Sequence, residues 1–249
     1  MTSTQAESKV FLVTGAARRI GAEIVKTLHR RGHRVIVHCR SSRVDAQNLC
    51  ASLNASRSDS ARCVFADLSI SAEVSSLAEA ALGVWGRIDG LVNNASVFYP
   101  TPVGEVAEAS FDHLIQVNLA APFFLSQALY PRLRRVQGSV VNIADVYGER
   151  PLKGYPVYSL SKTAVIGMTK ALALEMAPAV RVNAVSPGAI LWHEHPTPES
   201  EQQRVLERIP LEGLGAPQDI ASAVAFLLLD APYVTGQVFS VDGGRALTI

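Results

Sequence analysis

The chain has 249 residues and a nearly balanced charge, with 23 Lys and Arg residues against 22 Asp and Glu residues. This balance excludes the basic excess by which proteins hold nucleic acid or an anionic membrane surface. The length suits one α/β domain whose core is large enough to be stable without disulfide bonds or structural metal ions.

The N-terminal residues and the cysteines bear on where the protein is found. Residues 1–8 are polar, and the chain has no apolar run close to the roughly 18 residues of a membrane span. Cys39, Cys50 and Cys63 are odd in number and form no close pair in the sequence, which favours reduced thiols. We therefore expect a soluble cytoplasmic protein in which residues 1–8 form a flexible tail.

Short apolar runs alternate along the chain with longer segments of helical period. The runs predicted as strands are Val10–Val13, Val35–Val37, Cys63–Ala66, Gly90–Val92, Ser139–Ile143, Val182–Val185 and Val238–Val241. The segments predicted as helices are Ala22–Arg31, Val44–Leu53, Glu73–Trp85, Phe111–Leu133, Ser159–Met176 and Ile220–Leu229. Apolar strands separated by helices indicate a parallel sheet covered on both faces. The predicted fold class is therefore α/β, a doubly wound, Rossmann-like parallel sheet in a single domain of residues 1–249.

The segment Val13–Gly21 follows the first predicted strand and opens the first predicted helix. At this position a dinucleotide-binding fold turns a helix N-terminus towards the pyrophosphate. Gly15 permits the tight turn, and Gly21 lets the helix pack close to the sheet. Arg19 stands where a third glycine is usual, and its guanidinium can contact phosphate instead. The alternative is a glycine-rich turn that binds no ligand.

The end of the second predicted strand distinguishes between the two nicotinamide cofactors. A site for NAD places an acidic residue there for the ribose 2′-hydroxyl. This chain has Arg40, Ser41 and Ser42 and no carboxylate before Asp45, which suits a 2′-phosphate and predicts NADP(H). An ordinary polar loop is the alternative. Asp67, just after the third predicted strand, is placed to reach the adenine, although an ordinary turn residue looks the same.

Tyr158 and Lys162 lie four residues apart in a predicted helix, and Asp145 follows the fifth predicted strand. Positions i and i+4 share one helix face, so the Lys162 ammonium can lie near the Tyr158 phenol. A nearby positive charge is expected to lower the pKa of Tyr158 from about 10 and make it a usable proton donor or acceptor. The spacing alone also occurs in solvated pairs.

One predicted helix and one polar stretch each allow two structural interpretations. Apolar residues surround the predicted helix Ser159–Met176, so it is either buried in a large core or packs against another subunit. The long polar stretch His193–Gln203 is predicted to be irregular, and it is either a lid beyond the strand ends or a plain surface loop. Its residues His193, Glu194 and His195 lack further ligands, so we predict no metal site.

Several motifs follow one another in the order found in a known family. They are Thr14–Gly21, Asn93-Asn94-Ala95, Asn118, Tyr158 with Lys162, Pro187-Gly188 and Asp242-Gly243-Gly244. Together they resemble the short-chain dehydrogenase/reductase family, nearly from end to end. Within this family the chain is most similar to the pteridine reductases, including dihydromonapterin and dihydrofolate reductases of this fold. The residues that carry this likeness are Thr14–Gly21, Asn93–Pro100, Asp145 and Gly154–Tyr158.

The resemblance implies a role for each matching position. The implied catalytic residues are Asp145, Tyr158, Lys162 and Asn118. Tyr158 would donate the proton, Lys162 would hold the nicotinamide ribose, Asn118 would anchor a relay behind Lys162, and Asp145 would pass a proton to Tyr158. The implied NADP(H)-binding residues are Gly15, Arg18, Arg19, Ile20, Gly21, His38, Arg40, Ser41, Ser42, Asp67, Leu68, Asn94, Ala95, Ser96, Tyr158, Lys162, Pro187 and Gly188.

The implied substrate-binding residues are Arg19, Ser96, Phe98, Asp145 and Tyr158, with Phe98 stacking on one face of a pterin. Most of the wider family has serine where this chain has Asp145. Serine suits the oxygen of a ketone, whereas reduction of a ring C=N needs a proton at nitrogen, which an Asp–Tyr pair can relay. The plainer readings are a turn cap for Asp145 and core packing for Phe98.

The chain departs from the parasite pteridine reductases at three places. The second predicted strand ends in His38-Cys39-Arg40, the residues Leu191–His195 differ in content, and the tail ends Leu247-Thr248-Ile249 without a basic residue. The leading hypothesis is nevertheless NADPH-dependent reduction of a small-molecule pterin or folate. The alternatives are reduction of a ketone or ketoacyl thioester, and a non-catalytic NADP-sensing protein. The family resemblance and the apolar helix predict a homotetramer.

Overall fold

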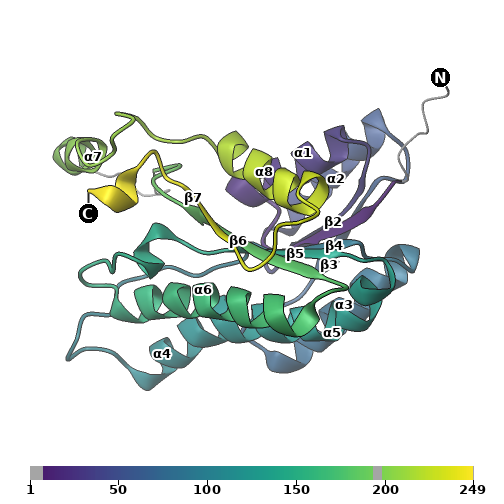
Figure 1. Cartoon of the computed structure of the whole chain (residues 1–249), viewed down its shortest axis with the longest axis horizontal. Coiled ribbons are helices and arrows are strands. Elements are labelled where there is room, and N and C mark those ends of the chain that lie inside the picture. Colours follow the sequence, from purple (N-terminus) through teal and green to yellow (C-terminus); the bar gives the residue numbers. More distant parts are fainter. Residues whose placement is uncertain (1–7, 193–197, 249) are drawn as a thin grey trace.

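A single parallel sheet organises the molecule. The computed structural model describes residues 8–192 and 198–248, whose seven strands lie in the order β3-β2-β1-β4-β5-β6-β7 (Figure 1). The strands are β1 (Val10–Val13), β2 (Arg34–Cys39), β3 (Ala61–Phe65), β4 (Gly90–Asn93), β5 (Ser139–Ile143), β6 (Arg181–Pro187) and β7 (Val238–Val241). Every neighbouring pair is parallel, which confirms the predicted fold class. Residues 1–7 of the predicted tail lie outside the described residues.

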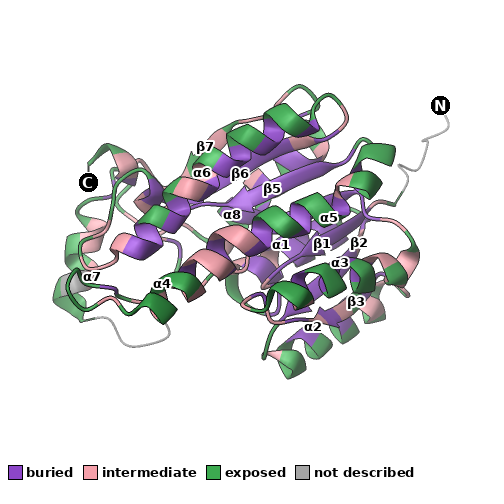
Figure 2. Ribbon diagram, turned by 90° about the horizontal axis from the view of Figure 1, so that it is seen from below, coloured by how far each residue is buried: buried purple, intermediate pink, exposed green. Residues whose placement is uncertain are grey.

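Two helical layers cover the sheet, one on each face (Figure 1). One layer comprises α1 (Arg19–Arg30), α2 (Arg43–Ser56) and α8 (Pro217–Ala225). The other comprises α3 (Ser71–Trp85), α4 (Glu108–Ile115), α5 (Ala121–Arg135) and α6 (Pro156–Met176). Strand residues alternate between the layers, as Leu12 packs towards α3, α5 and α6 while Val13 packs towards α1, α2 and α8. The inner strands are therefore buried on both faces (Figure 2), whereas the edge strands β3 and β7 are partly exposed.

The strand order reverses direction at β1. From β1 the chain builds outward through β2 to β3, and then returns to add β4 on the other side of β1. The connections that leave β1 and β4 therefore diverge at their carboxyl ends. In open α/β sheets this divergence opens a crevice, which is where ligands bind.

Two predicted segments differ from the structure. The predicted helix Phe111–Leu133 begins at Glu108, and a wider π turn, Gln116–Ala120, separates α4 from α5. The predicted irregular stretch His193–Gln203 was wrong in its second half, because α7 spans Glu199–Leu206. This short helix starts directly after Pro198 and has Glu199 in its first turn, both of which suit a helix N-terminus. Residues 193–197 lie outside the described residues.

The helix α6 packs on the sheet through one face, and its first turns also pack against α4. Val165, Met168, Leu172 and Met176 are buried in the core, whereas Leu174 is 79% exposed. Leu174 is therefore left uncovered within the described residues, and the homotetramer stays a prediction. None of the helices described here combines the length and hydropathy that a membrane span requires.

The substitution Gly21→Ala tests how closely the start of α1 packs against the loop that precedes it. A Cβ atom added to Gly21 lies 2.4 Å from the Gly15 carbonyl oxygen and 2.8 Å from the Ala16 Cα atom, so Gly21→Ala requires backbone movement. We expect it to lower the free energy of unfolding by about 1–3 kcal/mol. Gly83→Ala is the matched control, because this exposed site in α3 has no atom within 4 Å of the added methyl group, and it should stabilise by roughly 0.5–1 kcal/mol. Denaturant unfolding of both variants measures the difference, and equal stabilities would contradict the packing argument.

Candidate active site

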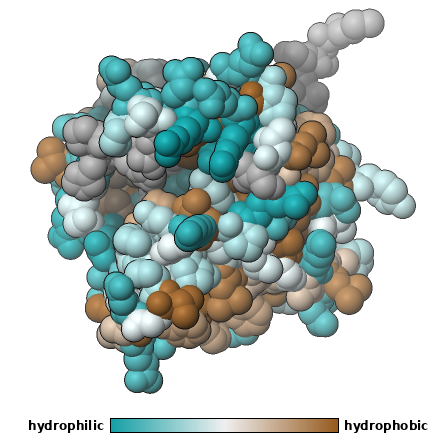
Figure 3. Space-filling model, turned by 90° about the vertical axis from the view of Figure 1, so that its left-hand side faces the viewer, coloured by the Kyte–Doolittle hydropathy of each residue, from teal (hydrophilic) through white to brown (hydrophobic). Residues whose placement is uncertain are grey.

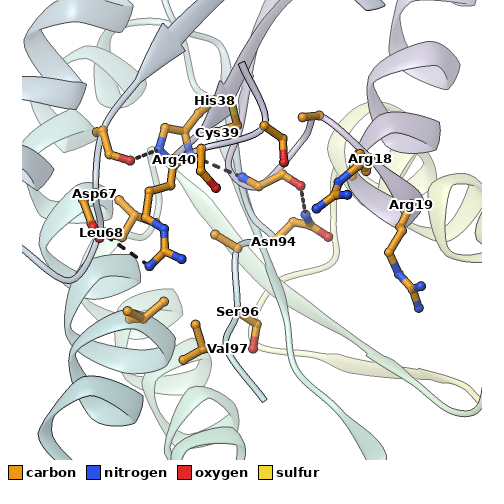
Figure 4. Close-up of a pocket in the computed structure, with 18 of the residues that line it drawn as sticks. Arg18, Arg19, His38, Cys39, Arg40, Asp67, Leu68, Asn94, Ser96 and Val97 are labelled. Atoms are coloured by element: carbon orange, nitrogen blue, oxygen red, sulfur yellow. Dashed lines mark hydrogen bonds and ion pairs between the residues drawn. The ribbon is translucent and has the colours of Figure 1, made fainter. Parts of the chain in front are cut away.

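A cavity of about 400 Å³ opens at the carboxyl ends of β1, β2, β3 and β4, where the strand order predicts a ligand crevice (Figure 4). Its size is in the usual range for small-molecule sites. The predicted cofactor residues that line it are Gly15, Arg18, Arg19, Ile20, Gly21, His38, Arg40, Ser41, Ser42, Asp67, Leu68, Asn94, Ala95 and Ser96. Ala17, Cys39, Ala66, Val97 and Val117 also line it and were not predicted. The molecular face beyond the strand ends carries many hydrophilic side chains in its upper half (Figure 3).

The loop between β1 and α1 forms one wall of the cavity. Gly15 has φ +61°, and its carbonyl oxygen accepts a hydrogen bond from Asn94 Nδ2 at 3.0 Å. No side chain caps the first turn of α1, which lines the cavity, so its backbone N–H groups are left for an anionic ligand. The geometry and the donors of this wall fit a pyrophosphate.

Arg19 occupies a backbone conformation that favours glycine. Its φ is +54°, a region that costs a non-glycine residue energy and persists where the surroundings impose it. The Arg19 guanidinium donates to the Trp192 carbonyl oxygen at 3.2 and 3.3 Å. This arginine therefore links the loop between β1 and α1, called the phosphate loop below, to the segment that follows β6, as well as lining the cavity.

Arg40 and Asp67 lie at one end of the cavity, and Arg18 and Arg19 at the other (Figure 4). Arg40 Nη1 is 4.0 Å from Asp67 Oδ2, and the Arg40 side chain is 55% exposed. Burial acts to raise the pKa of Asp67, but hydrogen bonds from Ser69 and the charge of Arg40 outweigh it and lower this pKa. Arg40 with the hydroxyls of Ser41 and Ser42 forms a donor group that fits a phosphate.

His38 is a buried link beneath the cavity. Burial lowers its pKa to about 4, so the ring is neutral at physiological pH. Its Nδ1 atom accepts from the Gly15 N–H at 3.3 Å, and its Nε2 atom donates to the Ala66 carbonyl oxygen at 3.1 Å. His38 therefore holds the phosphate loop against the end of β3.

Asp145, Tyr158 and Lys162 meet between the end of β5 and the first turns of α6. Tyr158 Oη donates to Asp145 Oδ2 at 2.8 Å, and Asp145 Oδ1 accepts from the Tyr147 N–H at 2.9 Å. Lys162 Nζ donates to the Ile143 carbonyl oxygen at 3.0 Å and lies 5.7 Å from the centroid of the Tyr158 ring. Asp145 thus does two things at once, because one oxygen caps the short helical turn Val146–Gly148 and the other holds the phenol.

The electrostatics of this group correct one prediction. Burial, and then the charge of Asp145, raise the pKa of Tyr158, whereas the sequence predicted that Lys162 lowers it. Burial also lowers the pKa of Lys162 to about 8 and raises the pKa of Asp145. The hydrogen bonds from the Tyr147 N–H and Tyr158 and the charge of Lys162 act against this rise in the pKa of Asp145, but burial outweighs them.

Asn118 positions the segment after β4 against α6. This residue lies in the π turn, is 2% exposed, and accepts from Ser96 Oγ at 3.1 Å and from the Val97 N–H at 2.9 Å. Its Nδ2 atom donates to Ser161 Oγ at 3.1 Å and to the Val97 carbonyl oxygen at 3.0 Å. Asn118 therefore braces the cavity wall behind Tyr158 and Lys162, and in this structure it makes no hydrogen bond to Lys162 itself.

Phe98 belongs to an aromatic group beside Tyr158. Its ring stacks on Tyr155, with centroids 4.5 Å apart and planes 7° apart, and meets Tyr158 edge-on at 4.7 Å. Tyr155 immediately precedes α6. The Phe98 ring therefore packs against Tyr155 and Tyr158, and its role in stacking on a pterin stays a prediction.

Some predicted residues do not line the cavity, and one buried residue near Asp145 was not predicted. Pro187 ends β6, Gly188 follows it, and neither is part of the cavity lining, although the Gly188 N–H donates to the Val241 carbonyl oxygen at 3.0 Å. Tyr158 and Lys162, which were also predicted to bind the cofactor, are not part of this lining either. Arg245 was not predicted, yet it is 7% exposed and donates to Tyr147 Oη at 2.8 Å. The one feature of the sequence that could have pointed to Arg245 is its position directly after the motif Asp242-Gly243-Gly244. Within the described part of the chain no three side chains could hold a metal ion, and His193, Glu194 and His195 lie outside it.

Comparisons with known proteins define the class to which this fold and site belong. Residues 15–246 match the family model described as enoyl-(acyl carrier protein) reductase. The chain is 37% identical to pteridine reductase 1 of Leishmania tarentolae, over 99% of both chains. It is 35% identical to the 3-oxoacyl-[acyl-carrier-protein] reductase of Synechocystis sp., over 98% of this chain and 99% of the relative.

A solved structure agrees with these relatives. The blue fluorescent protein from a metagenomic library, in complex with NADPH, matches with a TM-score of 0.90 and 34% identity, over 96% of this chain and 98% of that one. The chain therefore belongs to the short-chain dehydrogenase/reductase family and is an oxidoreductase. The relatives named here differ in substrate, so the substrate must be inferred from the site.

Lys162 is expected to reduce the stability of the cofactor-free protein. Because burial lowers its pKa from 10.5 to about 8, the cost of the buried ammonium is fully present below pH 8 and is relieved as the pH rises towards 10.5. Lys162→Met removes a cost of about 3 kcal/mol and loses one hydrogen bond worth about 1 kcal/mol. We expect a gain of roughly 2 kcal/mol at pH 7, shrinking by pH 10. Denaturant unfolding at both pH values measures it, and a variant less stable than the parent at pH 7 would show that the buried charge is compensated.

Proposed function

We propose that this protein binds NADPH and reduces a ring C=N bond of a pterin or folate. The observation that carries the proposal is the 2.8 Å hydrogen bond between Tyr158 Oη and Asp145 Oδ2. A carboxylate at this position is the feature by which the chain resembles pteridine reductases rather than the wider family. Similarity to pteridine reductase 1 of Leishmania tarentolae supports the same reading.

The donor groups of the cavity support the choice of NADPH. Arg40, Ser41 and Ser42 would hold the 2′-phosphate, and the first turn of α1 with Arg18 and Arg19 would hold the pyrophosphate. Asp67 turns its carboxylate towards Arg40, which leaves no unpaired acid at the 2′ position. The NADPH complex of the similar solved structure is consistent with this assignment. When bound, NADPH supplies the hydride that reduces the ring carbon.

The protein's own residues supply the proton. Tyr158 would protonate the ring nitrogen, and Asp145 would restore the phenol, because its carboxyl group accepts the hydrogen bond of the Tyr158 hydroxyl. Burial raises the pKa of Asp145, which brings its protonated form closer to physiological pH than in an ordinary carboxyl group. Lys162 would bind the nicotinamide ribose, and Asn118 would keep Ser96 and Val97 in place beside it.

Reduction of a ketone or ketoacyl thioester is the second candidate. The 35% identity to the Synechocystis 3-oxoacyl-[acyl-carrier-protein] reductase supports it, and Tyr158 with Lys162 would serve that chemistry as well. A non-catalytic NADP sensor would have no use for a buried acid in contact with a tyrosine. Asp145 therefore distinguishes the two enzyme hypotheses, since the serine of the wider family is sufficient to hydrogen-bond a ketone oxygen.

Steady-state consumption of NADPH by the unaltered protein tests the proposed function. We expect turnover with dihydropterins or dihydrofolate at a kcat/KM at least about 100-fold above that for a 3-oxoacyl thioester, a difference of roughly 3 kcal/mol in the barrier. Efficient reduction of the thioester without pterin turnover would instead establish the second candidate. NADPH binding without any turnover on either substrate would favour the sensor.

Arg40 should decide cofactor preference. One guanidinium–phosphate contact contributes on the order of 1.5–3 kcal/mol, so Arg40→Ala should weaken NADPH binding roughly tenfold to a hundredfold and leave NADH binding nearly unchanged. Arg62→Ala is the matched control, because Arg62 has a similar exposure of 54% and pairs with Asp59 away from the cavity. Fluorescence titration with each cofactor measures the preference. Equal NADPH affinity in both variants would remove Arg40 from the site.

Phe98 should contribute to substrate binding through its ring. Phe98→Ala is expected to raise the KM for a pterin by roughly threefold to tenfold or more, from a stacking contribution of about 0.5–1.5 kcal/mol, while NADPH affinity is retained. Tyr155→Phe keeps the ring that stacks on Phe98 and should leave pterin binding unchanged. If Phe98→Ala lowers the melting temperature sharply but spares KM, its ring is part of the core only.

A further inference from the structure

The three cysteines of the chain gather on one face of the sheet, beneath α2. Cys39 ends β2, Cys63 lies in β3 and Cys50 lies in α2, and all three pack with the same apolar cluster. The structure shows them as free thiols. The sequence predicts reduced thiols, because the three cysteines form no close pair along the chain.

The register of the strands selects one pair from the three. Cys63 is the register partner of Val37, whereas Cys39 is the partner of Phe65, so Cys39 and Cys63 are offset along the sheet. Cys50 reaches Cys63 from above, and their Sγ atoms are 3.0 Å apart. Because a disulfide bond is about 2.05 Å long, these two sulfurs need to approach by only about 1 Å.

The two thiols of this pair differ in exposure and acidity. Cys50 is 6% exposed, whereas Cys63 is partly exposed on β3, which is the edge strand of the sheet. The contact with Cys50 lowers the pKa of Cys63, and the contact with Cys63 together with burial raises the pKa of Cys50. Cys63 is therefore the sulfur that an oxidant in solution meets first and the better nucleophile of the two.

We propose that Cys50 and Cys63 form a reversible intramolecular disulfide, with a hydroperoxide as the oxidant and a small thiol as the reductant. The bond would fasten α2 to the edge strand within the native fold. It is independent of the proposed function, since neither residue lines the cavity.

The chemistry balances with one peroxide for each bond. The Cys63 thiolate attacks the peroxide, so an S–O bond forms, the O–O bond breaks and one water leaves once protonated. The Cys50 sulfur then attacks the Cys63 sulfur, the S–S bond forms, the S–O bond breaks and a second water leaves. The two thiols lose two electrons and two protons, and hydrogen peroxide becomes two waters. A small dithiol reduces the disulfide back to two thiols by thiol–disulfide exchange and is itself oxidised to a disulfide.

The bond would lie beside the cofactor end of the cavity. The helix α2 begins at Arg43, directly after the Arg40-Ser41-Ser42 group, and Cys39, which takes no part in the bond, is among the residues that line the cavity. Since the sulfurs are already in contact, we expect the oxidised protein to keep its fold and its NADPH affinity.

Peptide mapping of the unaltered protein tests the proposal directly. Cleavage after Arg43, Arg57 and Arg62 places Cys50 and Cys63 on separate tryptic peptides, and cleavage after Arg40 separates Cys39 from both. After treatment with hydrogen peroxide, we expect a cross-link between the Cys50 and Cys63 peptides, one remaining thiol out of three, and full reversal by dithiothreitol. The melting temperature should rise by about 5–10 °C, because the bond closes a short loop in the unfolded chain.

Variants and alternative products make the test decisive. Cys39→Ser should form the bond as the parent does, whereas Cys50→Ser and Cys63→Ser should form none and show no rise in melting temperature. A cross-link that involves Cys39, a cross-link between two copies of the chain, or oxidation of Cys63 to a sulfinic acid without any cross-link would overturn the proposal. Because the peptide map is read on the unaltered protein, it decides the question even if a serine variant fails to fold.

Discussion

The hydrogen bond between Tyr158 and Asp145 is the contact on which the account of this protein depends. It joins the end of β5 to the first turn of α6, so its 2.8 Å length requires both elements to be fixed relative to each other. Asp145 is held from behind by the Tyr147 N–H, and Lys162 is held by the Ile143 carbonyl oxygen. Three ionisable groups are thereby enclosed together, which shifts the pKa of each one and prepares them for proton transfer.

Buried polar contacts fix the elements that carry this group. Asn93 Nδ2 donates to Asn142 Oδ1 at 2.8 Å, and Asn142 Nδ2 donates to Thr169 Oγ1 at 2.9 Å, so a chain of hydrogen bonds runs from β4 through β5 to α6. A buried amide without a partner costs about 1–3 kcal/mol, which penalises any other placement of α6 on the sheet. At the other end of the cavity, His38 does the same for the phosphate loop. Buried hydrogen bonds, together with apolar packing, therefore fix the positions of the site residues.

Much of this could be predicted from the sequence, since strand period, helix period and local motifs each act over short distances. The sheet, the cavity wall around Gly15 and the Arg40 group follow from such patterns. The pKa of Tyr158 was predicted in the wrong direction, because burial is a property of the whole fold and outweighs one nearby charge. The π turn at Asn118, the helix α7, the second role of Asp145 as a cap and the Cys50–Cys63 contact also depend on tertiary neighbours that spacing does not reveal.

The measurement that tests the central claim most directly is pterin turnover by Asp145→Ser, with Asp145→Asn beside it. Serine and asparagine can both still cap the Tyr147 N–H, but neither can pass on a carboxylic proton. If Asp145 restores the proton of Tyr158, both variants should bind NADPH normally and lose about 10²–10⁴-fold in kcat for a pterin, and Asp145→Ser should keep or improve any ketone reduction. Unchanged pterin turnover in both variants would contradict the proton relay and reduce Asp145 to a cap.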